Sequence, residues 1–300
     1  MPGVKTFQTA PREERREGWA CPACGSPTED RAIRSEGFGF VRCARCALWR
    51  QQPLPDPEAV RLRYDQAYLS YELARQEEFR DLELRSLAEV GFPVDPGARG
   101  EATGGRALLD VGCATGALAA ALRERGWDAR GVEVSAVMAA RARADFGLEV
   151  FAGTLEEARF PDGAFDAVHA SHLIEHLHDP AAFLSECFRI LAPDGMLVLT
   201  TPNVRSFQFL LRGGAWRSAI RDHLVLFSDR TLSALAARSG FSLVRSATWG
   251  GWPVGSRPAF LKKPLDAAAK RLGVGDVMCL RFRKGGTGGG ASLAPGTGAR

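Results

Sequence analysis

The feature that most constrains the fold of this chain is an apolar strand pattern that runs directly into a turn of small residues. The strand pattern covers residues 107–111 and contains Asp110. Gly112, Ala114 and Gly116 follow, and a helical pattern rich in alanine and leucine begins at once. Small residues at such a turn let backbone N–H groups at a helix N-terminus approach a ligand closely. The pattern therefore predicts a ligand-binding strand–turn–helix unit.

A second apolar run ends in a carboxylate, Glu133, seventeen residues after Gly116, and Val134 follows it. In an open α/β sheet, the end of the second strand lies near the turn after the first strand. A carboxylate there can accept hydrogen bonds from both hydroxyls of a ribose. The turn and the acid together predict a site for a nucleoside-bearing cofactor, and their spacing fits either a dinucleotide or S-adenosylmethionine.

Strand and helix patterns alternate along residues 105–283, which predicts a doubly wound, mostly parallel α/β sheet with helices on both faces. Helix patterns cover 136–146 and open again at Asp179. The last two strand patterns are expected to close the sheet as an antiparallel pair. The predicted strands are 107–111, 129–134, 148–152, 164–170, 196–201, 241–248 and 277–282.

The turn resembles the first motif of the class I S-adenosylmethionine-dependent methyltransferases, an acid followed by three alternating glycines. Here the motif consists of Asp110, Gly112, Ala114 and Gly116, with alanine in place of the central glycine. The leading aspartate separates it from a dinucleotide fingerprint, which usually begins with glycine. The resemblance implies a seven-stranded Rossmann-like sheet, S-adenosylmethionine as cofactor, and methyl transfer to a small-molecule acceptor with a hydroxyl favoured.

The resemblance also implies roles for residues at the ends of later strands. Thr154 and Leu155 follow the third strand, where the family places a small polar pair against adenine. Leu155 and Val134 would enclose the adenine ring, and the loop that holds Ser171 would lie beside the methionine portion. The implied cofactor-binding residues are Asp110, Gly112, Ala114, Gly116, Glu133, Val134, Thr154, Leu155 and Ser171.

Four of the five histidines lie within ten residues, between His169 and His178. Among them, His172, Glu175 and His176 satisfy the inverted metalloprotease pattern, and on a helix they would share one face. Their place after a strand of a cofactor-binding domain argues against a protease. The Leu-Glu-His segment resembles the ubiquinone-pathway O-methyltransferases, in which two acids and a histidine cluster, in some with a metal. In this chain a histidine replaces the first of those acids.

Three histidines are candidates for a general base acting on a hydroxyl acceptor: His176, His172 and His223. An alternative role for His176 and its neighbour Glu175 is to fix the loop to nearby backbone. His223 begins a His-Leu-x-x-Phe-Ser run that is common before the last helix of small-molecule methyltransferases. Its alternative role is to cap the helix that opens at Ser228.

Two CxxC pairs near the N-terminus, separated by 18 residues, have the spacing of a zinc ribbon. Each CxxC turn presents two thiolates to one side, so two turns complete a tetrahedron. Residues 19–52 are therefore predicted to form a small module held by structural zinc, since a segment of this size buries too little core alone. The predicted ligands are Cys21, Cys24, Cys43 and Cys46.

The regions outside these two modules have simpler patterns. Residues 1–18 and 284–300 are expected to be disordered, and 53–104 to form a helical connector with a helix over 77–90. The connector holds all three tyrosines, which are expected either to pack in the core or to form a lid over the site. The aromatic residues expected to shape an acceptor pocket after the fifth strand are Phe207, Phe209 and Trp216.

The composition narrows the remaining possibilities. A net charge of +4 over 300 residues does not by itself indicate nucleic acid. The absence of an export signal or a long apolar run, together with seven cysteines, predicts a cytoplasmic protein without disulfides or a membrane span. A small acceptor with a sugar or phenol-like hydroxyl is favoured. Two alternatives stay open: an RNA methyltransferase that uses the ribbon to bind its substrate, and an inactive zinc-ribbon binding protein, the latter because of Ala114 and Thr154.

Overall fold

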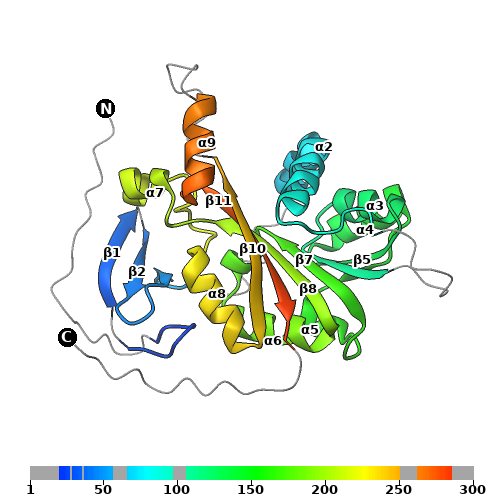
Figure 1. The fold of residues 1–300 in the computed structure, drawn as a ribbon, viewed down its shortest axis with the longest axis horizontal. Helices are drawn as coiled ribbons and strands as arrows, with labels where there is room; N and C mark the ends of the chain where they lie inside the picture. Colours follow the sequence, from blue (N-terminus) through cyan, green and yellow to red (C-terminus); the bar gives the residue numbers. More distant parts are fainter. Residues whose placement is uncertain are drawn as a thin grey trace.

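The computed structural model describes residues 20–27, 29–35, 37–56, 66–96, 106–250 and 262–285. Its larger sheet has seven strands in the order β10-β11-β8-β7-β4-β5-β6 (Figure 1). All neighbours are parallel except β10–β11 and β11–β8. The strands are β4 (Arg106–Val111), β5 (Trp127–Glu133), β6 (Val150–Ala152), β7 (Phe165–Ser171), β8 (Leu191–Pro202), β10 (Phe241–Trp249) and β11 (Val277–Lys284). The predicted doubly wound α/β fold, with its closing antiparallel pair, is confirmed.

Helices cover both faces of this sheet because successive strand residues point to opposite faces. Leu108 of β4 packs in one core with the apolar side chains of α3 and α4, while Leu109 packs in the other with those of α6 and α8. The helices are α3 (Ala117–Glu124), α4 (Ala136–Phe146), α5 (Leu155–Ala158), α6 (Pro180–Ile190) and α8 (Asp229–Arg238). Helix α4 has the predicted bounds, and Asp179 caps α6 as expected from the sequence.

A second, four-stranded sheet joins the N-terminal module to the larger domain. Three of its strands are β1 (Glu29–Ser35), β2 (Phe38–Cys43) and β3 (Trp49–Gln52), and the fourth is β9 (Val225–Leu226). Trp49 of β3 pairs with Leu226 of β9 in antiparallel register. The N-terminal module is therefore not a separate appendage, because its sheet is completed by a strand from the far half of the chain.

Helix α2 (Gln66–Glu89) is a single helix of 24 residues that contacts α3 (Figure 1). It begins earlier than the helix predicted over 77–90. Two further helices are α7 (Phe207–Arg212) and α9 (Lys262–Leu272), and short 3-10 turns cover η1 (Ile174–His176) and η2 (Gly213–Ala215). Among the described residues, no helix is both long and apolar enough to cross a lipid bilayer.

Some predictions fall on parts of the chain outside the described residues. They are the disordered arm over 1–18, nearly all of the tail over 284–300, residues 57–65 and 97–104 of the connector, and Tyr64, the first of its three tyrosines. Tyr68 lies in α2, but its side chain is not among those described.

Candidate cofactor and active site

The turn after β4 has the backbone conformation that small residues permit. Gly112 and Gly116 have φ values of 74° and 79°, and Ala114 between them has a φ of 47°. A Cβ atom on Gly116 would lie 2.7 Å from Leu148 Cδ1 and 2.8 Å from the Ala142 Cβ, so glycine is required there. The methyl group of Ala114 sits half-buried in the turn, and the left-handed conformation costs an alanine about 1–2 kcal/mol.

Glu133 at the end of β5 is tied to this turn by both carboxylate oxygens. Its Oε2 accepts a hydrogen bond from the Ala114 N–H at 3.0 Å, and its Oε1 accepts one from the Ser135 N–H at 2.8 Å. Burial raises the pKa of Glu133, and the two backbone N–H groups partly oppose that rise. In the part of the chain that the structure describes, no lysine or arginine forms an ion pair with it. Hydroxyl donors from a ribose fit such a buried, cation-free carboxylate.

Asp110, the leading acid of the turn, is paired with a histidine inside the sheet. Its Oδ1 lies 2.8 Å from the Nδ1 of His169, and both side chains are almost fully buried. Burial works against a charge on His169, but the Asp110 carboxylate outweighs it and raises the pKa of His169. Asp110 thus joins β4 to β7 beneath the site, a contact that the sequence pattern did not reveal.

Helix α2 brings a carboxylate to the same edge of the sheet. The Glu83 side chain hydrogen-bonds to Ser171 and lies near Asp110 and His169, and burial raises the pKa of this carboxyl. Nearer the N-terminal end of the helix, Glu72 lies close enough to Glu133 to raise the pKa of Glu133. The connector therefore covers the site with acidic side chains. Sequence reasoning missed Glu83, because nothing in its helical pattern distinguishes it from the other glutamates of α2.

The described lid tyrosine does not reach the site. Tyr71 is 48% exposed, and its ring packs against Phe79 and the Arg75 guanidinium on the outer side of α2. Of the residues expected near adenine, Leu155 is buried in the core, whereas Val134 is half-buried at the end of β5. Thr154 forms a capping box with Glu157 at the start of α5.

The segment after β7 does not form the helix on which three metal ligands would share a face. His172 has a φ of 50°, and only the short turn η1 follows it. The His172 Nδ1 nevertheless lies 3.1 Å from Oε1 of Glu175, and the Thr201 hydroxyl donates to Oε2 of Glu175 at 2.9 Å. Glu175 is fully buried, while the His172 side chain is 49% exposed. The pair thus has one buried member and one that reaches the surface of the site.

The charges of this pair support each other. Burial opposes ionisation of Glu175, but the neighbouring histidines, His172 above all, lower the pKa of that carboxyl to about 2. Burial also opposes a charge on His172, and hydrogen bonding to Glu175 outweighs it and raises the pKa of His172. Glu175 is therefore a buried carboxylate that orients an accessible imidazole.

His176 and His223 complete a compact cluster. Their ring centroids are 4.8 Å apart in an edge-to-face arrangement. Each Nδ1 lies beside a backbone carbonyl, that of Asp222 at 2.8 Å for His176 and that of Ser218 at 2.7 Å for His223. Burial lowers the pKa of His223 to about 4. The predicted role of His223 as a helix cap is wrong, because Ser228 caps α8.

The trio that could hold a metal differs from the one expected from the sequence motif. Glu175, His176 and His223 offer ligand atoms that all lie within 4.8 Å of one another, whereas His172 is not part of this trio. The backbone carbonyls beside each Nδ1 leave the Nε2 lone pairs of His176 and His223 free to bind.

The four N-terminal cysteines meet in space as their spacing predicts. The sulfurs of Cys21 and Cys46 are 3.4 Å apart, and those of Cys24 and Cys43 are 3.6 Å apart. Sulfur atoms around a tetrahedral zinc with bonds of about 2.3 Å lie at similar separations. Gly25, with a φ of 68°, gives the first CxxC turn its tight knuckle. The donor set fits a structural zinc ion.

The aromatic residues of the insertion are placed differently from the expectation. Trp216 is 2% exposed, and its indole N–H donates to Asp276 at 2.6 Å. Phe209 is also buried, in the core that joins the insertion to Trp49. Phe207 is exposed. Trp216 and Phe209 thus hold the two sheets together and do not shape an acceptor pocket.

Comparison with known proteins now identifies the family. Residues 72–246 match the protein family described as methyltransferase domain. This stretch includes the β4 turn, Glu133 and the histidine cluster. The chain belongs to the class I S-adenosylmethionine-dependent methyltransferases. The family implies S-adenosylmethionine as the methyl donor. In this methyltransferase the β4 turn, Glu133 and Ser171 lie at the carboxyl ends of β4, β5 and β7, the edge at which open α/β sheets bind ligands.

Individual relatives agree with this assignment. The chain is 29% identical over 153 residues to a ubiquinone biosynthesis O-methyltransferase of Psychrobacter arcticus, covering 46% of this chain and 60% of that protein. It is 35% identical over 120 residues to the protein of the same name from Alkalilimnicola ehrlichii, covering 37% and 49%. This methyltransferase therefore spans about half the length of the curated relatives that it matches.

Two solved structures share the fold. One belongs to the complex between the Haloferax volcanii Trm112 methyltransferase activator and a methyltransferase, with a TM-score of 0.56, 18% identity, and coverage of 77% of this chain and 100% of that chain. The other is an S-adenosylmethionine-dependent methyltransferase from Archaeoglobus fulgidus, with a TM-score of 0.52, 21% identity, and coverage of 71% and 99%.

Proposed function

We propose that this methyltransferase moves the methyl group of S-adenosylmethionine to a hydroxyl group of a small molecule. The observation that carries the proposal is the pairing of a fully buried Glu175 with a half-exposed His172 at the carboxyl end of β7. Relatives named as ubiquinone biosynthesis O-methyltransferases support oxygen as the acceptor atom. Phenol-like and sugar hydroxyls are the acceptor classes that we favour.

His172 is the proposed general base. Since the ionised Glu175 only accepts hydrogen bonds, it holds the neutral imidazole with its proton on Nδ1. Nε2 then carries a lone pair on the exposed side of the ring and can take the proton of an acceptor hydroxyl. His176 and His223 are less suited to this role in the proposal, because both are more enclosed and His223 has a lowered pKa.

The cofactor would be held by residues at the ends of β5 and β7 and on α2. S-adenosylmethionine supplies an electrophilic methyl group on a cationic sulfur. In the proposal, Glu133 accepts the ribose hydroxyls, Val134 borders the adenine, and Ser171 and Glu83 lie beside the cationic methionine portion. The acids of α2 favour a ligand with positive charge.

Structural zinc in the N-terminal ribbon is part of the same proposal. The four cysteine sulfurs lie within bonding range of one ion, and the described cysteines, including Cys113, Cys187 and Cys279, are all free thiols. Free thiols of this number support our placement of the protein in the reducing cytoplasm.

The two residues that favoured an inactive protein have structural roles of their own. Ala114 fits its turn and donates its N–H to Glu133, and Thr154 caps a helix. Trp49, an aromatic residue of the ribbon that could stack on a base if it were exposed, is only 5% exposed. We therefore favour catalysis on a small molecule over both alternatives.

The test is methyl transfer from S-adenosylmethionine to 3,4-dihydroxybenzoate and related catechols by the wild type and by His172→Gln. We expect the substitution to lower kcat by a factor on the order of 100 or more and to leave the binding of S-adenosylhomocysteine unchanged. His178→Gln is the matched control, since His178 bonds to the Pro55 carbonyl away from Glu175. An unchanged kcat in His172→Gln would remove this residue from the mechanism.

A further inference from the structure

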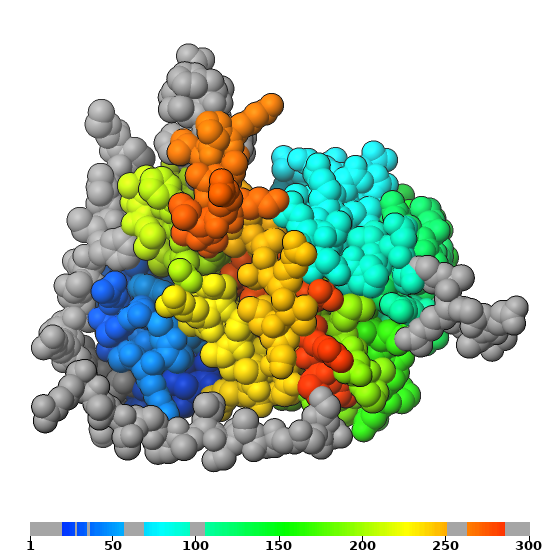
Figure 2. Space-filling model, in the orientation of Figure 1, coloured from blue at the N-terminus to red at the C-terminus, as the bar shows by residue number. Residues whose placement is uncertain are grey.

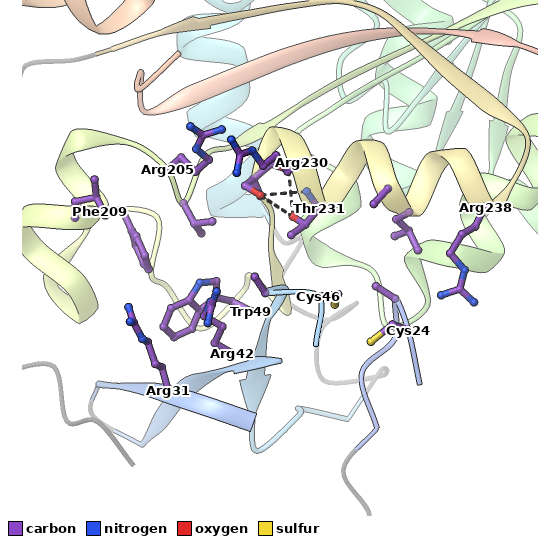
Figure 3. A pocket seen from close by; sticks show the side chains of 17 residues that line it. Cys24, Arg31, Arg42, Cys46, Trp49, Arg205, Phe209, Arg230, Thr231 and Arg238 are labelled. Atoms are coloured by element: carbon purple, nitrogen blue, oxygen red, sulfur yellow. Dashed lines mark hydrogen bonds between the residues drawn. The ribbon is translucent and has the colours of Figure 1, made fainter. Parts of the chain in front are cut away.

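A cavity of about 570 Å³ lies between the ribbon and helix α8. In Figure 2, the blue ribbon residues pack beside the yellow residues of α8 and its surroundings. In Figure 3, Arg31, Arg42 and Trp49 rise from the ribbon strands toward α8, which carries Arg230 and Arg238. Its volume is in the range of small-molecule binding sites. None of its lining residues belongs to the β4 turn, Glu133 or the histidine cluster.

Arginines are the most numerous charged groups of this cleft. Five of them line it, and no aspartate or glutamate does: Arg31, Arg42, Arg205, Arg230 and Arg238. Cys24 and Cys46, two of the four proposed zinc ligands, also line its ribbon side. Asp30 pairs with Arg42, and Asp229 pairs with Arg205 at 3.0 Å, so these two guanidinium groups are held in place.

Three of the five arginines remain uncompensated. Arg31, Arg230 and Arg238 are exposed and form no hydrogen bond or ion pair with any other residue that the structure describes. They come from both sides of the cleft, the first from the ribbon and the other two from α8. Unpaired guanidinium groups on both sides of one cleft create a positive potential that favours an anion between them.

The inner wall of the cleft is apolar. Trp49 and Phe209 are 5% and 3% exposed, and their rings meet edge to face with centroids 5.6 Å apart. Leu210 lines the cleft beside them and, at 63% exposed, offers the apolar surface that a ligand can reach. A ligand that occupies the cleft would therefore place an apolar or aromatic group inward and its charges outward.

We propose that this cleft binds a phosphorylated small molecule with an aromatic ring, of the size of a nucleoside diphosphate. The planar guanidinium groups suit the paired oxygens of phosphate groups, and Arg42 and Arg205 are already oriented by their aspartates. The ring packs against the exposed Leu210, beside the buried Trp49–Phe209 pair. The proposal stands apart from the proposed methyl transfer, because it rests on different residues.

The test is calorimetric titration of the full-length, zinc-loaded protein saturated with S-adenosylhomocysteine, so that the cofactor site does not contribute. The probes are uridine 5′-diphosphate, uridine and inorganic pyrophosphate. We expect the diphosphate to bind at least roughly tenfold more tightly than either fragment, since it alone engages both the arginines and the apolar wall. The double substitution Arg230→Gln/Arg238→Gln should weaken its binding by roughly tenfold or more.

Arg271→Gln is the matched control, because Arg271 is an exposed arginine on α9 outside the cleft. Retained binding of S-adenosylhomocysteine reports that each variant is folded, and Arg31→Gln replaces the double variant if that one is not. Binding of the diphosphate no tighter than that of uridine, or undiminished in the arginine variants, overturns the proposal. Tight, salt-sensitive binding of single-stranded RNA without binding of the diphosphate also overturns it and assigns the cleft to nucleic acid.

Discussion

The backbone N–H of Leu224 donates a hydrogen bond of 2.7 Å to the carbonyl oxygen of Glu175, while the carbonyl of Leu224 accepts one of 2.7 Å from the Gln51 N–H of the ribbon. Leu224 thus connects the backbone of Glu175, whose carboxylate orients the proposed base, to the N-terminal module. His223 precedes Leu224 in the chain, and its ring packs against that of His176. The ribbon is therefore hydrogen-bonded through a single residue to the histidine cluster.

Loss of the proposed zinc should reach the active site through this bridge. We expect Cys43→Ser to lower the metal content from about one zinc per chain, reduce the melting temperature, and lower kcat. Metal analysis, thermal unfolding and methyl-transfer rates measure the three effects. Cys187→Ser is the control, because Cys187 is a buried thiol outside the cysteine cluster. Full activity in metal-free Cys43→Ser would show that the bridge does not transmit the change.

Metal analysis also decides the role of the histidine trio. We expect no second metal, since hydrogen bonds from His172 and Thr201 already occupy both oxygens of Glu175. A second equivalent that disappears in His223→Ala, while the cysteine-bound zinc remains, would contradict this expectation.

Glu133→Gln should weaken cofactor binding at a modest cost to the fold. Both carboxylate oxygens accept backbone N–H bonds, and the amide nitrogen of glutamine cannot accept one, so one of these bonds is lost together with the charged acceptor for ribose hydroxyls. We expect a loss in binding of S-adenosylhomocysteine of about 1–3 kcal/mol and a free energy of unfolding lowered by about 1 kcal/mol, because removal of the buried charge offsets part of the lost bond. Calorimetric titration and urea unfolding measure these quantities. Glu149→Gln, an exposed carboxylate on the approach to β6, should change neither.

Glu83→Gln should reduce the preference of the site for S-adenosylmethionine over S-adenosylhomocysteine. S-adenosylmethionine carries a positive sulfur that S-adenosylhomocysteine lacks, so removal of a nearby negative charge should weaken the former more strongly. The ratio of the two dissociation constants is the measurement. Glu78→Gln on the exposed side of α2 is the control. An identical ratio in Glu83→Gln and wild type would place this carboxylate away from the reacting atoms.

The Asp110–His169 pair predicts a stability effect with a defined sign. Because the pKa of His169 is raised above its ordinary 6.5, the stabilisation from the pair is fully present below pH 6.5 and is lost as pH rises through the raised value. The free energy of unfolding of the wild type should therefore exceed that of the double variant Asp110→Asn/His169→Phe, which leaves no unpaired carboxylate, by more in mildly acidic than in alkaline solution. Urea unfolding at several pH values tests this, and a difference that grows with pH would contradict it.

Much of this architecture could be predicted from local sequence patterns. Strand periodicity and small turn residues located β4, β5 and the closing antiparallel pair, and the cysteine spacing located the N-terminal cluster. These are properties of short segments. The contact of His169 with Asp110 joins residues 59 positions apart, and no local pattern encodes it.

The remaining differences have the same origin. On a helix, His172, Glu175 and His176 would share one face, but the left-handed φ of His172 excludes that helix. Trp216 was expected at a pocket because it lies on an insertion, and only the fold shows that Asp276 holds its indole N–H in the core. Glu83 belongs to the site because α2 packs against the carboxyl edge of the sheet, a tertiary contact that the helical pattern of its own segment does not encode.

The strand that β9 contributes to the ribbon sheet has a consequence for how the chain reaches its native state. Gln51 finds its partner Arg221 170 positions further along the sequence. A nascent chain can gather the four cysteines early, but the edge of β3 stays unpaired until the histidine-containing half has been synthesised. The ribbon and the catalytic domain should thus complete folding in one cooperative event, and a truncated protein that lacks residues 19–52 would expose the apolar surface around Phe209 and Leu226 instead of yielding a smaller enzyme.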